Sequence, residues 1–571
     1  MKNLEIAGKF YEIADILEMK KVEWKPQAYR RAARSIETLS KDIEIIYNKG
    51  GISALKNIPG VGDAIAKKIE EFLNTGKIKG YDKLKKSIPQ GIETLTHIPG
   101  MGPKRALILF KKLKIKSVKD LEKAAKSGKI SKLSGFGAKS EQDILKGIAL
   151  LKSSAGKMPL GKAWPIVQSI MSDLNKLKEI KKISLAGSVR RRKEVVRDFD
   201  ILAVSPNPKK VIDAFTKLSD VKSVLAKGST KSSVRLNQGI NCDLRVVENK
   251  SFGAALQYFT GSKEHNIRCR QVAIKKGLKL NEYGVFSVKT KKYICGKTEP
   301  EVYKKLGMQY IEPELRENQG EIEAAQKNKL PKLIGYKDIK GDLQMHTKYS
   351  DGVNTIEEMA KAAKELGYEY IAITDHSKSE HIARGMSEKQ LLKYLAEIDN
   401  VNKKVKGIHI LKSAEVDILA DGSLDYSDAY LKKLDIVVAA VHSGFKSTRT
   451  EMTNRIIKAL ENRHVNILAH PTGRLINQRS PYPINLDKVF DACKSNNVWP
   501  EIDAFPSRLD LNDLNIRTAI DKKVKLVIDT DSHSKDHLRY MQFGIATARR
   551  GWARKTDIIN TLPWKKFEKL L

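Results

Sequence analysis

The stretch KISLAGSVRRRKEVVRDFDILAV, residues 182–204, predicts two strands of a sheet joined by a turn and a basic loop. The first strand covers residues 183–186, and the second begins near Asp198. Because side chains alternate along a strand, Asp198 and Asp200 should lie on one face of it. Two carboxylates on one face repel each other unless a cation lies between them. The stretch therefore predicts a metal site on a sheet.

A third carboxylate would complete this site. NCDLRVV, residues 241–247, is typical of another short strand, and its Asp243 could join the pair from a neighbouring position in the same sheet. Three carboxylates with few other ligands suit two Mg²⁺ ions that also bind substrate phosphates, the arrangement for in-line phosphoryl transfer. A structural alternative is that the D-x-D sequence caps a turn or pairs with the arginines at 190–192.

The charge of the chain indicates its partner. Of 571 residues, 106 are Lys or Arg and 67 are Asp or Glu, which gives a formal charge of +39. Residues 1–330 carry +32 and residues 331–571 only +7, whereas nine of the eleven histidines lie beyond residue 330. So basic a first part favours nucleic acid over anionic lipid as the partner.

Length and composition limit the class of protein. A chain of this length with 41% hydrophobic residues predicts three to five folded domains, which excludes a wholly disordered chain. Four cysteines without C-x-x-C spacing indicate free thiols. The N-terminus is charged and the longest apolar runs are short, so we expect a cytoplasmic protein without a membrane span.

Three similar segments in the first 150 residues predict contacts with the DNA backbone. IPGVGDAIAKKIEEF begins at Ile58, IPGMGPKRALILFKKL at Ile98 and LSGFGAKSEQDIL at Leu133. Each places two glycines before a helix, whose free N–H groups suit a phosphate oxygen. The repeats resemble helix-hairpin-helix elements, which hold DNA without reading its sequence, and an ordinary helix–turn–helix is the alternative. The predicted DNA contacts are Gly60, Gly62, Gly100, Gly102, Lys104, Gly135 and Gly137.

The motifs around the three carboxylates resemble those of the family X DNA polymerases. G-S-x-R-R followed by D-x-D is similar to the family's nucleotidyltransferase palm, and YFTGSKEHNIRCR, residues 258–270, is similar to its nucleotide pocket. The resemblance implies that Asp198, Asp200 and Asp243 are catalytic and hold two Mg²⁺ ions. It implies gapped or primed DNA and deoxynucleoside triphosphates (dNTPs) as partners. The implied nucleotide-binding residues are Gly187, Ser188, Arg191, Tyr258, Phe259, Gly261, Asn266 and Arg270.

The N-terminus resembles the same family's deoxyribose-phosphate lyase domain. The resemblance covers WKPQAYRRAA, residues 24–33, and the first glycine hairpin. It implies that Lys68 is the Schiff-base lysine, which would attack a ring-opened abasic sugar. It also implies that Lys25, Tyr29 and Arg30 contact a 5′ phosphate. The alternative is that Lys68 only contacts phosphate.

Beyond residue 336 the chain repeats short apolar runs that end in His, Asp or Glu: DLQMHTKYSDG, YIAITDH, ILKSAEVD, DIVVAAVHSG, NILAHP, VWPEID and KLVIDTDSH. The polar ends are 27 to 39 residues apart, which is the spacing of βα units, so they should converge at one rim of a parallel barrel. Imidazoles and carboxylates gathered there suit Mn²⁺, Zn²⁺ or Fe ions. The end residues are His346, His376, Glu415, His442, His470, Glu501 and Asp531.

These runs resemble the PHP (polymerase and histidinol phosphatase) domain. The resemblance implies up to three Mn²⁺ or Zn²⁺ ions and 3′→5′ exonuclease action, with abasic-site or 3′-phosphate cleavage as further reactions. One position departs from the family, because its opening H-x-H is Gln344-Met345-His346 here, and Asp342 is a candidate replacement. The implied ligands are His346, Asp351, His376, Glu415, His442, His470, Asp531 and His533.

Together these patterns predict a multidomain protein of mixed α+β and α/β class. Its predicted function is gap filling in base excision repair by a nucleoid-associated monomer, with the barrel processing DNA ends. The alternatives are a barrel that acts as a structural clamp or as a small-molecule phosphatase. The predicted domains are a helical lyase-like domain (1–85), helix-hairpin-helix fingers (86–150), a palm with a mixed sheet (151–255), a small thumb (256–317), a linker (318–335) and a distorted (β/α)7-type PHP barrel (336–571).

Overall fold

A computed structural model describes residues 2–37, 39, 43–58, 60–89, 92–96, 98, 101–154 and 156–571. The chain forms two units, residues 1–155 with the short segment 477–480, and residues 156–476 with 481–571. Within the described residues, no helix has both the length and the apolar character needed to cross a membrane.

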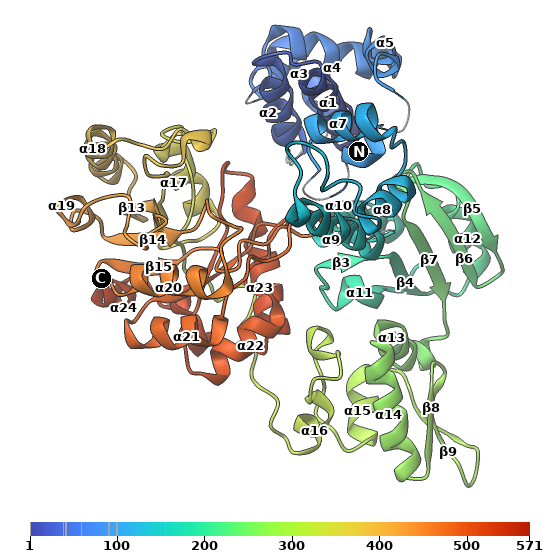
Figure 1. Ribbon diagram of the computed structural model, residues 1–571. Coiled ribbons are helices and arrows are strands. Elements are labelled where there is room, and N and C mark those ends of the chain that lie inside the picture. The colour runs from blue at the N-terminus through green and yellow to red at the C-terminus, as the bar shows by residue number, and fades with distance from the viewer. Residues whose placement is uncertain are drawn as a thin grey trace. The chain divides into compact units, whose positions relative to one another are not determined.

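The first unit is helical (Figure 1). Its helices are α1 (Lys2–Met19), α2 (Lys25–Glu37), α3 (Ile43–Lys56), α4 (Asp63–Thr75), α5 (Tyr81–Lys86), α6 (Ile92–Thr96), α7 (Pro103–Leu113), α8 (Val118–Lys126) and α9 (Ala138–Ser154). They pack around two small apolar cores. One core contains Phe10 and Phe72 from α1 and α4, and the other contains Leu109 and Ile144 from α7 and α9.

The glycine repeats form turns that lead into helices, as predicted. Gly62 and Gly102 are the extended residues directly before α4 and α7, with φ of −85° and −72°. Gly60 has φ of +77°, and a Cβ there would lie 2.8 Å from Cγ of Arg31, so glycine is required. Gly100 lies outside the described residues.

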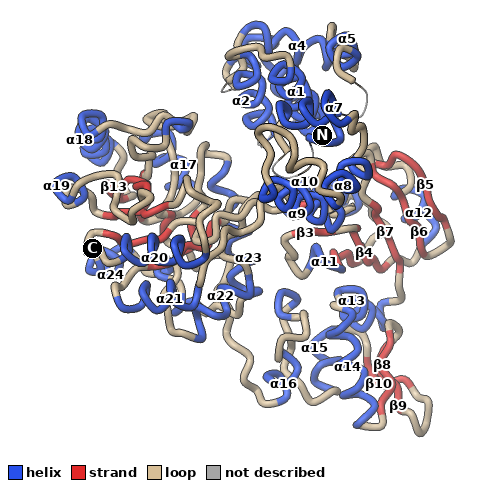
Figure 2. The backbone as a smooth tube through the Cα atoms, viewed as in Figure 1, coloured by secondary structure: helices blue, strands red, loops and turns tan. Residues whose placement is uncertain are grey.

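The second unit begins with a five-stranded mixed sheet, visible in Figure 2. Across the sheet the order is β2 (Lys182–Ala186), β4 (Asp198–Val204), β7 (Asn241–Val246), β6 (Lys231–Leu236) and β5 (Val221–Lys227). β4 runs parallel to β7, and the other neighbours are antiparallel. The remaining elements here are β1 (Met158–Pro159), α10 (Leu160–Asn175), α11 (Gly187–Arg190), β3 (Val195–Val196) and α12 (Pro208–Phe215). Both strands predicted in residues 182–204 are present.

A smaller sheet and its helices follow. They are α13 (Phe252–Thr260), α14 (Lys263–Lys275), β8 (Leu278–Asn281), β9 (Gly284–Ser287), β10 (Tyr293–Cys295), α15 (Glu299–Lys305) and α16 (Glu321–Gln326). The three strands form a separate antiparallel sheet. Residues 318–335, predicted as a linker, contain α16, whose Ile322 and Ala325 pack in one apolar core with Leu306 and Trp552.

The C-terminal region is a seven-stranded parallel sheet that closes into a barrel. Its strands lie in sequence order: β11 (Gly341–Asp342), β12 (Tyr370–Ile373), β13 (His409–Asp417), β14 (Ile436–Ala440), β15 (Val465–Leu468), β16 (Trp499–Asp503) and β17 (Val527–Asp529). A parallel bridge between Met345 and Ser532 joins the first strand to the last, and the His346 N–H donates to the Ser532 carbonyl at 2.7 Å. The predicted barrel is therefore confirmed.

Helices surround these strands, as Figure 1 shows. They are α17 (Ile356–Glu365), α18 (Glu388–Lys404), α19 (Asp428–Leu431), α20 (Arg449–Leu460), α21 (Leu486–Ser495), α22 (Asp513–Asp521) and α23 (Met541–Arg550). The last helix, α24 (Trp564–Phe567), packs Phe567 on Tyr370, with ring centroids 4.4 Å apart. Because Tyr370 begins β12, α24 covers the end of the barrel where the strands start. The opposite rim is left for the strand-end histidines and carboxylates.

Candidate active sites

The strand register brings the three predicted carboxylates to the same region of the mixed sheet. Asp200 in β4 lies opposite Asp243 in the parallel strand β7, and Asp198 begins β4. Phe199, between the two β4 aspartates, is buried in the core of the sheet. Asp198 and Asp200 therefore share the other face, the arrangement that the alternation predicts.

Burial and mutual repulsion act on these carboxylates. Burial, with the charges of Asp198 and Asp243, raises the pKa of Asp200 to about 6. Burial and Asp243 also raise the pKa of Asp198. Beside Asp243 lie Nζ of Lys231 at 3.7 Å and the guanidinium of Arg245 at 3.8 Å. A divalent cation would relieve the remaining repulsion, so the donor set fits Mg²⁺.

The arginines of the basic loop are engaged elsewhere. Arg190 forms a bidentate pair with Glu299 of α15, with N–O distances of 2.8 and 2.6 Å. Arg191 pairs with Glu317 at 2.9 Å, and Arg192 stacks on a tryptophan ring with 3.6 Å between guanidinium carbon and ring centroid. Because these three arginines bind other partners, the contacts favour a cation site at Asp198 and Asp200 over ion pairs between these aspartates and the arginines.

The turn after β2 lies against the carboxylates. Gly187 has φ of +63°, and a Cβ there would collide with Oδ2 of Asp200. Ser188 follows, half-buried in α11. Arg191, directly after α11, also donates a hydrogen bond to the Thr260 carbonyl. Ser188 and Arg191 thus lie on one short segment beside the carboxylates.

The predicted nucleotide-pocket residues lie on α13 and α14. Tyr258 and Phe259, near the end of α13, contact each other edge to face, with ring centroids 5.1 Å apart. The amide of Asn266 accepts from a neighbouring glutamine at 2.8 Å and donates to the Tyr258 carbonyl at 2.6 Å, so protein groups fix its orientation. Gly261, with φ of +70°, follows α13, and Arg270 is exposed on α14.

The eight predicted barrel ligands all lie at the rim where the strands end. They are His346 after β11, Asp351 in the following loop, His376 after β12, Glu415 in β13, His442 after β14, His470 after β15, and Asp531 and His533 after β17. The repeated strand pattern therefore brings together side chains that are far apart in the chain.

Glu415 lies at the centre of the histidines. Its Oε1 atom is 3.2 Å from Nε2 of His442 and 3.0 Å from Nε2 of His470. Its Oε2 atom is 3.2 Å from Nε2 of His346 and 3.4 Å from Nδ1 of His376. Although burial opposes ionisation, His442 and the hydrogen bond with His346 hold the pKa of Glu415 well below its ordinary value.

Two further carboxylates extend this cluster. Asp531 is 3.1 Å from Nε2 of His346, and Asp351 is 3.3 Å from Nε2 of His533 and 3.7 Å from Nε2 of His376. Burial lowers the pKa of His376 to about 3, which keeps its imidazole neutral, the form that binds metal. The overlapping groups whose donor atoms could share an ion include His346, Asp351, His376 and His533; His376, Glu415 and His442; and His346, Glu415 and Asp531.

Position 344 departs from this donor set. Gln344 lies two residues before His346, the first of the predicted ligands. The Gln344 amide is fully buried, and neither its oxygen nor its nitrogen has a hydrogen-bond partner. Asp342, the candidate replacement, accepts from the N–H and hydroxyl of Thr530 at 3.1 and 2.5 Å. Its carboxylate is therefore already engaged.

Two charged groups at the rim are not predicted by the sequence pattern. Asp417, two residues beyond the central glutamate in β13, lies 2.5 Å from Nδ1 of His442 and orients that ring. Arg508, in the loop after β16, has Nε 3.5 Å from a carboxylate oxygen of Asp531. Asp417 lies two residues after Glu415 in ILKSAEVD, so strand alternation could have indicated that the two side chains share a face. No sequence pattern indicates Arg508.

Glu501, the remaining strand-end residue, supports the loop that follows β15. Its carboxyl group accepts a hydrogen bond from the His470 N–H at 2.6 Å. Burial raises its pKa well above the ordinary value, so a neutral carboxyl group is favoured. Glu501 thus holds the backbone of a predicted ligand in place.

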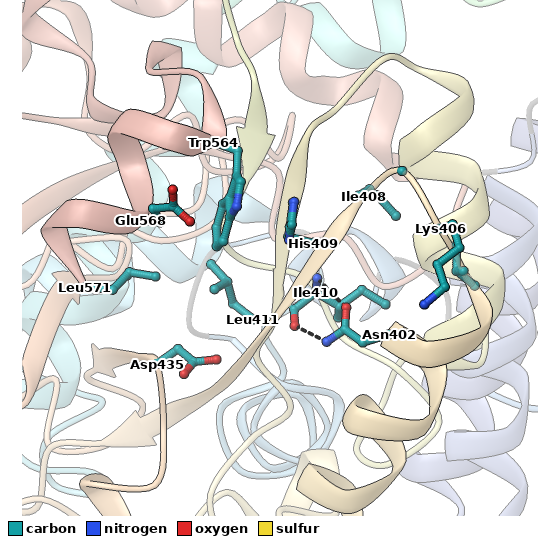
Figure 3. Close-up of a pocket in the computed structure, with 12 residues that line it drawn as sticks. Asn402, Lys406, Ile408, His409, Ile410, Leu411, Asp435, Trp564, Glu568 and Leu571 are labelled. Carbon is teal, nitrogen blue, oxygen red and sulfur yellow. Dashed lines mark hydrogen bonds between the residues drawn. The ribbon is translucent and has the colours of Figure 1, made fainter.

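A separate hollow opens at the end of the barrel where the strands begin (Figure 3). Its volume is about 520 Å³, and its lining includes Asn402, His409, Asp435 and Trp564. The His409 ring stacks on Trp564 with centroids 4.1 Å apart. This stacking gives His409 a packing role, in contrast to the histidines at the rim.

In the first unit, the predicted lyase residues lie on α2 and α4. Lys68 is half-buried on α4, and Lys25 is exposed at the start of α2. Tyr29 packs edge to face on a phenylalanine ring, with centroids 5.5 Å apart. Arg30 pairs with two carboxylates of α1 at 2.6 and 2.7 Å, so its charge is already matched.

Four family models match parts of the chain. A helix-hairpin-helix domain matches residues 1–78, and a SAM-like helix-hairpin-helix tandem matches residues 92–149. The DNA polymerase beta thumb matches residues 255–317, and the PHP domain matches residues 342–493.

Curated relatives extend these matches. The DNA polymerase/3′-5′ exonuclease PolX of Bacillus subtilis is 36% identical over 550 residues, which cover 96% of this chain and 95% of the relative. A probable phosphatase of Thermoanaerobacter sp. is 31% identical over 231 residues, 38% of this chain and 89% of the relative. A probable phosphatase of Acetivibrio thermocellus is 30% identical over 201 residues, 34% of this chain and 78% of the relative.

Proposed function

Because the chain belongs to the family X DNA polymerases that carry a C-terminal PHP domain, we propose that it fills short gaps in DNA during base excision repair and trims 3′ ends at the barrel rim. The substrates are gapped or primed DNA and dNTPs. The enzyme acts as a monomer in the cytoplasm, at the nucleoid.

The mixed sheet performs nucleotide addition. Asp198, Asp200 and Asp243 would hold two Mg²⁺ ions, which would neutralise charge on the phosphates and activate the primer hydroxyl. Ser188 and Arg191 hold the triphosphate. The remaining pocket side chains orient the nucleotide: Tyr258 and Phe259 exclude a ribose 2′-hydroxyl, Asn266 faces the minor-groove edge of the base, and Arg270 approaches the template.

The register between β4 and β7 carries this proposal, because it sets Asp243 opposite Asp200 on a strand that is remote in sequence. We test it with Asp243→Ala in single-nucleotide gap filling. Activity should be abolished, whereas Asp213→Ala, which removes an aspartate paired with Lys227 at 2.5 Å elsewhere in the same domain, should leave it intact. Undiminished gap filling by Asp243→Ala would exclude the three-carboxylate site.

The barrel rim performs phosphoester hydrolysis. The eight proposed ligands would hold up to three Mn²⁺ or Zn²⁺ ions, which would supply a hydroxide nucleophile at neutral pH. Asp417 orients His442, and Arg508 holds Asp531. Abasic-site cleavage and removal of a 3′ phosphate are further reactions of the same centre, because each breaks a phosphoester at a DNA end or nick.

His442→Ala should abolish Mn²⁺-dependent 3′ processing and leave primer extension intact. His409→Ala, at the opposite end of the barrel, is the matched control and should preserve both activities. If His442→Ala eliminates both activities together, the proposed division of labour between sheet and barrel is wrong.

The similarity to two probable phosphatases favours one alternative, a barrel that hydrolyses small phosphate esters. Phosphate release from histidinol phosphate, compared with nucleotide release from 3′-recessed DNA, separates the two substrate classes. Faster turnover of histidinol phosphate would favour the phosphatase.

The unpartnered amide of Gln344 supports the other alternative, in which the barrel is a structural clamp. Metal analysis of the full chain after dialysis against Mn²⁺ tests it. Fewer than about one bound ion per chain would favour the clamp.

We propose lyase activity for the first unit, with Lys68 as the amine. Borohydride should trap a covalent adduct with a 5′-deoxyribose-phosphate end, and Lys68→Ala should remove that adduct. An adduct of equal yield in Lys68→Ala would assign the reaction to another lysine.

A further inference from the structure

An arginine of the PHP barrel lies against the segment that carries Arg191. Arg550, the last residue of α23, is only 5% exposed. One of its terminal nitrogens donates to the Arg191 carbonyl at 3.0 Å and to Oε1 of Glu317 at 3.1 Å, and the other donates to Asp513. A side chain of the barrel thus contacts the loop that we assign to the triphosphate.

Glu317 connects the two arginines. The same Oε1 atom accepts from Nε of Arg191 at 2.9 Å, and Nζ of Lys193 lies 3.8 Å from the other carboxylate oxygen. Although burial opposes ionisation, Arg191, Arg550 and Lys193 hold the pKa of Glu317 below its ordinary value. The carboxylate is therefore charged, and that charge is divided between an arginine of the palm and an arginine of the barrel.

We infer that Arg550 is a positioning residue for nucleotide addition: it draws the charge of Glu317 away from Arg191 and anchors the Arg191 backbone, so that Arg191 can bind the triphosphate. The inference rests on the proposed role of Arg191. Arg191 is held by the half-buried carboxylate of Glu317, and this ion pair must weaken before the guanidinium can bind phosphate. Because Arg550 binds the same carboxylate oxygen, it lowers the free energy needed to weaken the pair. The barrel is then part of the polymerase site.

The test compares Arg550→Gln with Arg549→Gln in the full-length protein. Arg549 is a matched control, because it also ties α23 to the segment before the barrel, but through Glu314 and the Ile334 carbonyl, both at 2.8 Å. In single-nucleotide gap filling, Arg550→Gln should raise the KM for the dNTP about tenfold with a much smaller change in kcat. Arg549→Gln should change KM by less than about twofold, and both variants should retain the 3′ exonuclease.

A second substitution separates charge sharing from a structural role. In Glu317→Gln/Arg550→Gln the carboxylate charge is gone, so the KM should return to within about twofold of the wild-type value. A purely structural defect would persist in the double variant. Equal KM values in Arg550→Gln and Arg549→Gln, or a double variant no better than Arg550→Gln, would overturn the inference.

Two further variants keep the result interpretable. If Arg191→Ala leaves the dNTP KM unchanged, the proposed triphosphate role is wrong. If Arg191→Ala raises the KM and Arg550→Gln does not, only the present inference fails.

Should Arg550→Gln not fold, Arg550→Lys replaces it. One ammonium cannot hold the Arg191 carbonyl, Glu317 and Asp513 together, so we expect a KM rise of about threefold, again abolished by Glu317→Gln.

Discussion

The palm and the PHP barrel both gather proposed metal ligands, but with opposite electrostatics. In the palm, carboxylates face one another, and burial with their mutual repulsion raises the pKa of Asp200 to about 6. At the barrel rim, Glu415 contacts four imidazoles, of which His346 and His442 have raised pKa values and keep it ionised despite its burial. The palm therefore needs cations to relieve repulsion, whereas the barrel already contains its own positive partners. Substitutions should separate the two regions cleanly.

The largest effect should come from removing charge in the palm. Asp200→Asn keeps the size of the side chain but takes away one of the three carboxylates proposed to bind metal, and we expect kcat for primer extension to fall at least about 10³-fold. Exonuclease activity on 3′-recessed DNA should be retained, because its ligands lie in the barrel. Asp213→Asn is the control. A loss of less than about tenfold would contradict the assignment of Asp200 as a metal ligand.

Acid should act on a buried carboxylate of the thumb, which pairs with Arg190 of the palm. Although burial opposes ionisation, Arg316 and Arg190 lower the pKa of Glu299 from 4.5 to about 2. A carboxyl group whose pKa is lower in the folded than in the unfolded protein stabilises the fold at pH values above its unfolded pKa. This stabilisation is lost as the pH falls from about 4.5, the unfolded pKa, towards 2, the folded pKa. Glu299→Gln should therefore destabilise the protein by about 3 kcal/mol at neutral pH.

The measurement is thermal unfolding from pH 7 down to pH 3, with Glu301→Gln as the neighbouring control. The difference between wild type and Glu299→Gln should shrink as pH falls below about 4.5, because Glu299 of the unfolded chain then binds a proton that the folded protein, with a pKa of about 2, does not. A difference that stays constant over this range would show that charge is not its source.

In the barrel, the support of a ligand can be removed without touching the ligand itself. Asp417→Ala deletes the acceptor 2.5 Å from Nδ1 of His442, so the ring loses its fixed orientation. We expect Mn²⁺ affinity, measured by titration, to fall about 10- to 100-fold, with a parallel loss of 3′ processing. Primer extension should not change. Asp421→Ala, in the following exposed turn, should leave the titration unaltered; an equal loss there would indicate a general effect on the loop.

How much the sequence predicts differs between these same two regions. The strand-end residues repeat with the βα units, so one pattern finds the seven strands and six of the eight proposed ligands, whereas Asp351 and His533 come from the resemblance to the PHP domain. In the palm, alternation predicts that Asp198 and Asp200 share a face, but the register with Asp243 depends on which strands become neighbours. Side chains that act between regions follow no local pattern: Arg550 ends an ordinary helix, and only the tertiary structure brings it to Arg191.

Gln344 sharpens this comparison further, because it places a neutral amide at the position where the opening H-x-H of the PHP family has a histidine. Its oxygen and nitrogen are both buried without a hydrogen-bond partner, which is costly unless the oxygen faces a cation. Gln344→His offers a stronger donor to Mn²⁺ or Zn²⁺ in a similar volume, so we expect about tenfold tighter binding of the weakest ion, or about one additional ion per chain. Metal analysis of the full-length protein measures this, with Gln344→Ala as the control that should bind no more metal than the wild type. Identical stoichiometry and affinity in all three proteins would mean that position 344 does not face an ion. The buried amide without a hydrogen-bond partner would then only destabilise the fold.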